Sequence, residues 1–173
     1  MGEGLVAVVL ALLLGYGIWL FNRLVQERNT TLAAWSDIGV QLKRRHDLIP
    51  KLVEAVKTYS TYEQSTLTRV TELRGAAARA EKPAESGRIE SELTGALHKL
   101  IAVAEAYPDL KTSEQFLSLM REISQVEKDI QHARRYYNGA VKQFNVRVES
   151  FPSNAVAALF RFVPAEYFDA DAT

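Results

Sequence analysis

The densest group of residues that could do chemistry is basic. It consists of Lys43, Arg44, Arg45, His46 and Asp47. Such a cluster can bind an acidic or phosphorylated partner, or anionic lipid headgroups. In an upright helix, however, Arg44 lies about 33 Å from Asn22 by helix rise, which disfavours lipid contact. We favour a solvated helix face in which Arg44 or Arg45 pairs with Asp47 and steadies a kink, with partner recognition as the alternative.

Two asparagines form the second candidate site. Asn138 and Asn145 lie seven residues apart in a long helical pattern, beside Tyr137 and Phe144. Asparagines on a partly buried helix face commonly set the register between helices. We favour this interpretation over a polar groove for a ligand.

Patterns typical of catalysis or metal binding are absent from the sequence. The three histidines, His46, His98 and His132, fall in different segments, and none has a carboxylate or another histidine three or four residues further on. The Glu-x-x-His pair that builds di-iron sites in helical bundles does not occur. The chain has no cysteine, which excludes disulfides, thiolate zinc ligands and a cysteine nucleophile. We expect no enzyme activity, no cofactor and no metal.

Net charge and chain length restrict the possible functions and the number of domains. The chain has 173 residues, 21 of them basic and 21 acidic, so its net charge is zero. A dedicated nucleic-acid binder normally has a strong basic excess, so nucleic acid is not an expected partner. The length suits one domain with an attachment.

An uncharged run of 17 residues, LVAVVLALLLGYGIWLF, occupies residues 5–21. This is at the short end of what spans a hydrocarbon core of about 30 Å. The alternative is a cleaved signal peptide, which would need positive charge before the run, where only Glu3 stands, and a small-x-small site after it. We predict a transmembrane anchor over residues 1–22. Arg23 and Arg28 follow at once, so the positive-inside tendency places the amino terminus outside and the rest in the cytoplasm.

The first helix is expected to leave the membrane without a break. Its predicted inward stripe comprises Leu32, Trp35, Gly39, Leu42, Ile49, Val53, Val56, Leu67 and Val70. Pro50 must kink this helix or open a new one capped by Asp47, and a kink is favoured because there is little spacer for a reversal. The helix is expected to end in the proline- and glycine-containing stretch 81–87.

Two more helical patterns follow. The first covers residues 89–107 and is stopped by Pro108. The second is the longest, with Thr112 as its predicted N-cap and Gln115 completing a capping box. Its stripe of about 36 residues, roughly 54 Å of helix, must have partner helices along its length. The stripe comprises Phe116, Leu119, Met120, Ile123, Val126, Ile130, Ala133, Tyr137, Ala140, Val141, Phe144, Val148 and Phe151.

The predicted organisation is all-α. A transmembrane helix continues into an elongated antiparallel helical bundle over residues 23–162, which includes a short segment, 153–162, after Pro152. Residues 163–173 form a tail that combines acidic residues with aromatic ones. The aromatic residues of the ending are expected to fold back onto the bundle, with an external partner as the alternative.

Two stretches together resemble the LemA family of bacterial membrane-anchored proteins. They are residues 34–59, AWSDIGVQLKRRHDLIPKLVEAVKTY, and residues 137–162, YNGAVKQFNVRVESFPSNAVAALFRF. The resemblance implies an amino-terminal anchor, a short extracytoplasmic amino terminus and a bundle of the four-helix type, with no catalytic residues. In two places the chain departs from the family pattern. Arg161 stands where a glycine is usual between two phenylalanines, and residues 163–166 replace a more proline-rich tail.

We therefore expect a single-pass protein of the bacterial inner membrane that acts as a non-enzymatic scaffold or adaptor. It would organise membrane proteins, with self-association as one route. The family has a magnetosome-associated branch and is often encoded near membrane proteases, so a membrane protease is a candidate partner. The alternative is a membrane-tethered sensor or binding module. It would recognise an acidic or phosphorylated partner at Lys43, Arg44, Arg45 and Asp47, or a ligand at Asn138 and Asn145.

Overall fold

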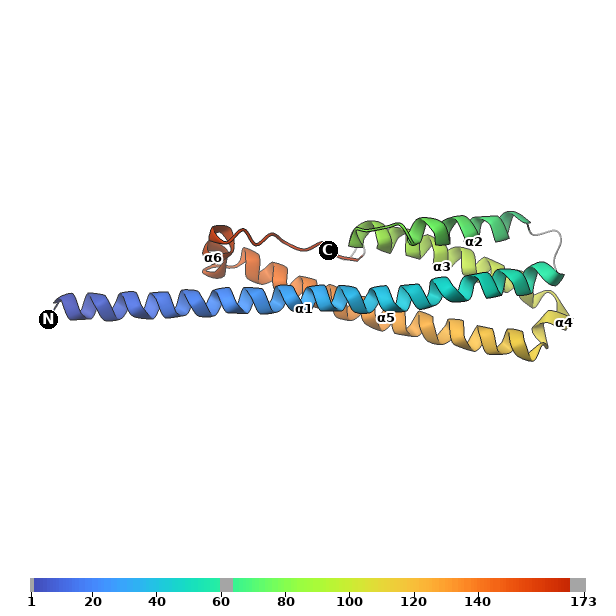
Figure 1. The fold of residues 1–173 in the computed structure, drawn as a ribbon, viewed down its shortest axis with the longest axis horizontal. Helices are drawn as coiled ribbons and strands as arrows, with labels where there is room; N and C mark the ends of the chain where they lie inside the picture. Colours follow the sequence, from blue (N-terminus) through green and yellow to red (C-terminus); the bar gives the residue numbers. More distant parts are fainter. Residues whose placement is uncertain (1, 60–63, 169–173) are drawn as a thin grey trace.

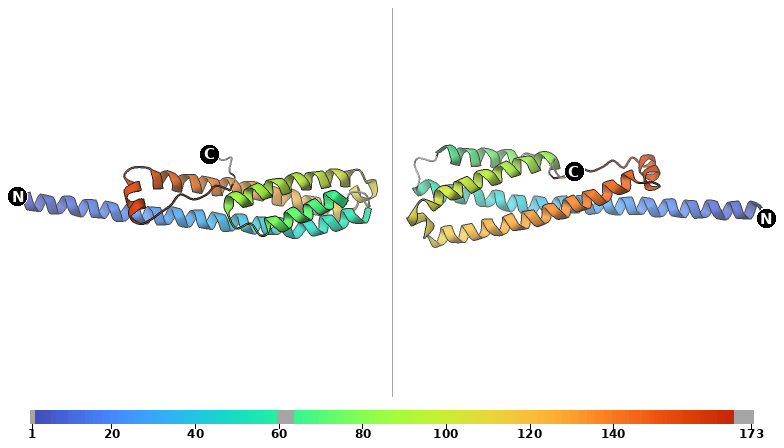
Figure 2. Two further views of the ribbon diagram at one scale, coloured as in Figure 1. Left: turned by 90° about the horizontal axis from the view of Figure 1, so that it is seen from above. Right: turned by 180° about the vertical axis from the view of Figure 1, so that it is seen from behind.

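The computed structural model describes residues 2–59 and 64–168, which form six helices and no strand. The helices are α1 (Gly2–Tyr59), α2 (Gln64–Ala77), α3 (Pro83–Glu105), α4 (Pro108–Lys111), α5 (Glu114–Glu149) and α6 (Ser153–Leu159). They build an elongated antiparallel bundle from which the first part of α1 projects (Figure 1, Figure 2). The predicted all-α fold is confirmed.

The longest element, α1, is a single helix of 58 residues that joins the apolar run to the bundle. Within the described residues it is the one helix long and apolar enough to cross a membrane. Side chains of the run, such as Leu5, Leu12 and Leu14, are exposed. The length and the exposed apolar surface of this run are those of a helix that crosses a bilayer.

Pro50 lies inside α1 and does not start a new helix, so Asp47 caps nothing. Because proline has no N–H, the carbonyl of His46, four residues earlier, lacks its usual helical partner. Arg74 of α2 donates to this oxygen from Nε at 2.8 Å. The gap that Pro50 leaves in one helix is therefore filled by a side chain of another.

The main error of prediction concerns α2. One helix was expected to reach the stretch 81–87, but α1 ends at Tyr59 and α2 runs back along the bundle beside α3 (Figure 1). No aliphatic residue occurs between Val56 and Leu67. For about three turns, a continuing helix would have no aliphatic stripe to hold it to the bundle. Leu67 and Val70 keep the helical spacing, which is why periodicity alone did not reveal the reversal.

The inward face of α1 also differs in part from the prediction. Leu32 and Gly39 are exposed, whereas Ala34 and Ile38 are buried. The buried face includes Arg45, together with the polar Thr31 and Glu27. A search for apolar residues does not detect buried positions that carry polar or charged side chains. The predicted stripe therefore included exposed residues of α1 and left out buried ones.

From Phe116 to Val148, the stripe predicted for α5 is buried, except that Met120, Ala133 and Ala140 are half-buried. Phe151, its predicted last member, is 86% exposed, because α5 ends at Glu149. The N-cap of α5 is Ser113 rather than Thr112, and Ser113 Oγ accepts a hydrogen bond from the N–H of Phe116. The backbone of Thr112 instead closes α4.

The bundle changes its make-up along its length. In the half far from the anchor, α1, α2, α3 and α5 pack as four helices (Figure 1). In the half near the anchor, α1 and α5 continue as a pair, and residues 163–168 lie along them (Figure 2). Phe168 is 2% exposed and packs against Trp35, which in turn contacts Tyr137. The expected fold-back is confirmed for Phe168, whereas Asp169 and Asp171 lie outside the described residues.

Candidate functional site

A buried ion cluster joins three helices in the middle of the bundle. Arg45 of α1 is 2% exposed, and its guanidinium contacts the carboxylates of Glu90 on α3 and Glu127 on α5. Nη1 lies 2.6 Å from Oε1 of Glu127 and donates to the hydroxyl of Thr94 at 2.7 Å. Charge-assisted hydrogen bonds of this kind are directional, so the cluster orients α1, α3 and α5 relative to one another.

Glu90 has a second hydrogen-bonding neighbour, His46. Nε2 of His46 lies 2.7 Å from Oε1 of Glu90, while Arg45 contacts the other oxygen. Burial by itself would raise the pKa of Glu90. The hydrogen bond with His46 and the charge of Arg45 outweigh that effect and hold the pKa below its ordinary value of 4.5. Glu90 is therefore ionised at neutral pH, and the cluster is suited to locking helices together rather than to moving protons.

The same cluster does not have the make-up of a metal centre. Among residues 2–59 and 64–168, no group of three or more histidine, cysteine, aspartate or glutamate side chains is placed to hold a metal ion. Arg45 occupies the space between the two carboxylates, which is where a cation would otherwise sit.

The residues predicted for this region separate in the structure. Lys43 and Asp47 are exposed, and Arg44 lies 3.6 Å from Asp129 of α5. The expected pairing of Arg44 or Arg45 with Asp47 is wrong. The core-facing positions of α1 recur every three or four residues, which turns Arg45 inward and Asp47 outward.

Sequence reasoning missed Glu90 and Glu127. Glu90 lies on the otherwise apolar face of α3, between Gly87 and Leu93, just as Arg45 lies on the core-facing side of α1. Arg45 and Glu90 are opposite charges among the core-facing residues of two helices, and this was the signal that could have paired them.

A second ion cluster joins α1 to α5 closer to the anchor. Glu27 is 5% exposed, and both of its carboxylate oxygens lie 2.8 Å from Nε of Arg147. Arg23 donates to the same carboxylate from one turn earlier on α1, at 3.1 Å. This cluster holds the two helices together within two turns of the end of the apolar run.

The two predicted asparagines both bind the returning chain. Asn145 donates from Nδ2 to the carbonyl of Ala165 at 2.9 Å and accepts from its N–H at 2.8 Å. Oδ1 of Asn138 accepts from the N–H of Phe168 at 3.0 Å. The polar groups thus pair with an irregular main chain that has no helical partners of its own. From the sequence, these asparagines were expected either to set the register between helices or to line a groove for a ligand. Binding of the returning chain is neither of these.

Tyr137 adds a third contact to the same segment. Its hydroxyl donates to the carbonyl of Glu166 at 2.7 Å. Burial and the negative charge of Glu166 raise the pKa of Tyr137 to about 12, so the hydroxyl keeps its proton at neutral pH. It therefore acts as a hydrogen-bond donor to the tail.

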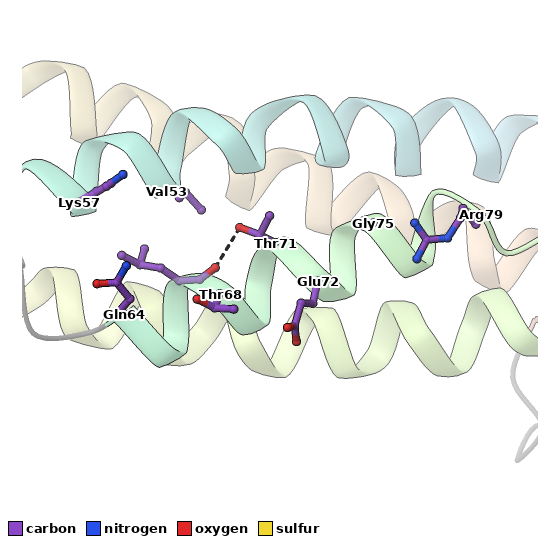
Figure 3. A pocket seen from close by; sticks show the side chains of 9 residues that line it. Val53, Lys57, Gln64, Thr68, Thr71, Glu72, Gly75 and Arg79 are labelled. Atoms are coloured by element: carbon purple, nitrogen blue, oxygen red, sulfur yellow. Dashed lines mark hydrogen bonds between the residues drawn. The ribbon is translucent and has the colours of Figure 1, made fainter.

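An open groove of about 600 Å³ lies between α1 and α2, in the half of the bundle far from the anchor (Figure 3). Val53 and Leu67 supply apolar surface, and Lys57 and Arg79 lie at its two ends. At Gly75, an added Cβ would meet only the side chain of Arg79, with Nη1 at 3.7 Å. Glu72 also lines the groove, so its charged side chains are of both signs.

Comparison with known proteins assigns the chain to a family. A model of the LemA family matches residues 34–173, which is most of the chain. The chain belongs to the LemA family. This confirms the family that the two motifs predicted.

Named relatives extend over nearly the whole chain. Protein LemA of Metamycoplasma hominis is 29% identical over 178 residues, which cover 94% of this chain and 81% of that protein. Magnetosome protein MamQ 2 of Paramagnetospirillum magneticum is 26% identical over 189 residues, covering 94% and 68%. Magnetosome protein MamQ of Magnetospirillum gryphiswaldense is 23% identical over 190 residues, covering 95% and 68%.

Together with the exposed apolar part of α1, these relationships make this LemA family member a single-pass, membrane-associated protein. Proteins of the family are not known enzymes. The structural features from which a function can be inferred are the continuous helix α1, the two ion clusters, the tail and the groove.

Proposed function

We propose that this LemA family member is a membrane-anchored scaffold or adaptor without enzymatic activity. It holds other membrane proteins, or further copies of itself, at a set distance from the bilayer. The bundle lies in the cytoplasm and the short amino terminus outside the inner membrane, an orientation that Arg23 and Arg28 favour.

The observation that carries the proposal is the continuity of α1. One helix contains the apolar run and also Val53, which lines the groove about 48 Å beyond Phe21 by helix rise. The ion clusters around Glu27 and Arg45 tie this helix to α5 and α3, so bending it would break buried charge-assisted bonds. A stiff connection between a membrane and a binding surface is what a scaffold requires.

The groove supplies the contact surface. Val53 and Leu67 and the two cationic ends suit an amphipathic segment whose acidic residues face Lys57 and Arg79 and avoid Glu72. Such a segment can come from a second membrane protein, for which a membrane protease is a candidate, or from a second copy of this chain.

A sensor or binding module that recognises an acidic or phosphorylated partner is the second candidate function. At the residues first predicted for it, Arg45 is buried and paired, and both asparagines bind the tail. Lys57 and Arg79 offer that function a different location, because both line the open groove.

The decisive measurement is the mass of the full-length protein purified from its own membrane in mild detergent. It compares the wild type with Gly75→Leu, which projects a side chain into the groove. Gly39→Leu is the matched control, because Gly39 is another helical glycine with open space around it and lies outside this groove. We expect a defined assembly for the wild type and Gly39→Leu, and its loss in Gly75→Leu without a change in melting temperature.

Each other outcome has a distinct meaning. A monomer without a stoichiometric partner in all three preparations contradicts the scaffold function. An assembly that survives Gly75→Leu moves the contact surface away from the groove. Loss of the partner in Lys57→Glu but not in Gly75→Leu favours recognition of an acidic group over shape.

A further inference from the structure

The apolar run of α1 is only just long enough to cross a bilayer. Its 17 residues span about 26 Å, compared with about 30 Å for a hydrocarbon core. A short span is accommodated by thinning of the bilayer or by nearby residues that enter its surface. The lipid surface must therefore reach at least to Phe21, the last residue of the run.

Parts of the bundle lie at this same level. The ring of Phe160, directly after α6, is 4.6 Å from the ring of Phe21, and Phe162 is 5.9 Å from it. Phe151, which follows α5, lines a cavity together with Tyr16 and Trp19, both within the apolar run. A bilayer that covers the run to Phe21 thus meets the end of α5 and the whole of α6.

Four large apolar side chains near this level are exposed. Phe151 is 86% exposed, Leu159 76%, Val163 72% and Phe160 54%. They come from three consecutive pieces of chain, namely the α5–α6 connection, the end of α6 and the segment after it. Large apolar side chains gathered in this way normally mark a surface that something else covers.

Arg161 adds charge at the same place, in a costly conformation. The end of α6 is closed by hydrogen bonds from the N–H of Phe162 to Ala157 and from that of Arg161 to Ala158, at 2.9 and 3.3 Å. Arg161 occupies the left-handed position of this motif, with φ of 57°, where glycine is favoured. The side chain is exposed beside Phe160 and Phe162, where an arginine can reach lipid phosphates.

We propose that α6 and its flanking residues form a collar that inserts into the lipid surface around the base of the anchor. In this collar, Phe151, Leu159, Phe160 and Val163 enter the interfacial region, and Arg161 contacts lipid phosphates. The collar lengthens the apolar surface of a short span and fixes the tilt of the bundle. It depends on the anchor but not on the groove or on any protein partner.

Nitroxide accessibility tests the collar on the full chain. Because the sequence has no cysteine, Leu159→Cys and Phe151→Cys each give one labelling site. Leu117→Cys is the matched control, since Leu117 is also exposed and lies near the start of α5, at the opposite end of the bundle. The labelled proteins are placed in vesicles of three parts phosphatidylethanolamine to one part phosphatidylglycerol. Collision rates with oxygen and with a water-soluble nickel chelate are then measured.

We expect labels at 159 and 151 to show several-fold lower access to nickel and higher access to oxygen than the label at 117, as lipid contact requires. Nickel access equal to that at 117 would overturn the collar, because the surface would then face water. Low access to both reagents would overturn it as well, because the residues would then be covered by protein, such as a second copy.

Discussion

At the scale of single residues, Arg45 has the greatest effect on how the helices meet. It is the cation shared by Glu90 and Glu127, which come from different helices. Removing an ion from water costs several kcal/mol, and this cost is offset only when the ion is paired and hydrogen bonded. The stability contributions of Arg45 and Glu90 should therefore be strongly coupled.

The first prediction concerns this coupling. Arg45→Met should lower the free energy of unfolding by about 3–5 kcal/mol, because it leaves the buried carboxylate of Glu90 without the guanidinium that pairs with it. Denaturant unfolding followed by circular dichroism measures the loss. Arg44→Met, at an exposed pair with Asp129, should change stability by less than about 1 kcal/mol. The double variant Arg45→Met with Glu90→Leu should recover much of the stability that Arg45→Met loses. If the losses of the two single variants simply add in the double variant, the coupling is refuted.

The second prediction is a pH dependence. The pKa of Glu90 is lower in the folded chain than its ordinary value of 4.5, so its ionisation stabilises the fold above that pH. This stabilisation is lost as the pH falls below about 4.5 and through the folded pKa. The melting temperature of the wild type should therefore exceed that of Glu90→Gln at pH 7, and the difference should shrink between pH 5 and pH 3. A difference that stays constant over this range would contradict the assignment.

At the scale of elements, the contact between α1 and α2 depends on a missing hydrogen bond. Pro50 cannot donate to the carbonyl of His46, and Arg74 of α2 does so instead. The proline therefore leaves α1 continuous and gives α2 a specific hydrogen bond to it.

A double-mutant cycle tests this role. Arg74→Met should lower the free energy of unfolding by about 1–3 kcal/mol, because a half-buried carbonyl loses its donor. In a Pro50→Ala background, the alanine N–H can bond to the same oxygen, so the cost of Arg74→Met should be clearly smaller. Equal costs in the two backgrounds would mean that Arg74 stabilises the bundle in another way.

At the scale of the whole molecule, the tail packs near the anchor in the position that α2 and α3 occupy in the other half of the bundle. Near the anchor, α2 and α3 are absent, and residues 163–168 cover the pair formed by α1 and α5. Asn138, Asn145 and Tyr137 bind the main chain of this segment, while Phe168 fills the space beside Trp35. A chain end without regular structure thus completes the core of a helical bundle.

The fourth prediction follows from this arrangement. Asn145→Ala removes both hydrogen bonds to Ala165 and should lower the free energy of unfolding by about 1–3 kcal/mol. Hydrogen exchange should become faster in residues 163–168 and stay unchanged in α2 and α3, because both lost hydrogen bonds join α5 to Ala165. Asn154→Ala, at an exposed position of α6, is the control and should alter neither quantity. Faster exchange throughout the bundle would show that the tail supports more than the half near the anchor.

Much of the fold could be predicted from the pattern of apolar residues. The stripe from Phe116 to Val148 is continuous, so it identified α5 and its buried face. The two ends of the bundle were harder. The reversal after Tyr59 carries no proline or glycine, and the exposed Phe151 looks like any member of a stripe. Spacing along one helix reports which residues share a face, but not where the chain turns back.

The amino-acid sequence by itself determined the class of this protein: the apolar run, the helical periodicity and the two family motifs each depend on residues close together in the chain. The tertiary structure decided the rest. It brought Arg45 to Glu90 and Glu127, Arg74 to the carbonyl of His46, and Asn145 to Ala165. The partners in these contacts lie 20 to 82 residues apart. Burial makes such pairs necessary, because an unpaired charge or carbonyl inside a core is costly. Only the packing of the helices determines which distant residue supplies the partner.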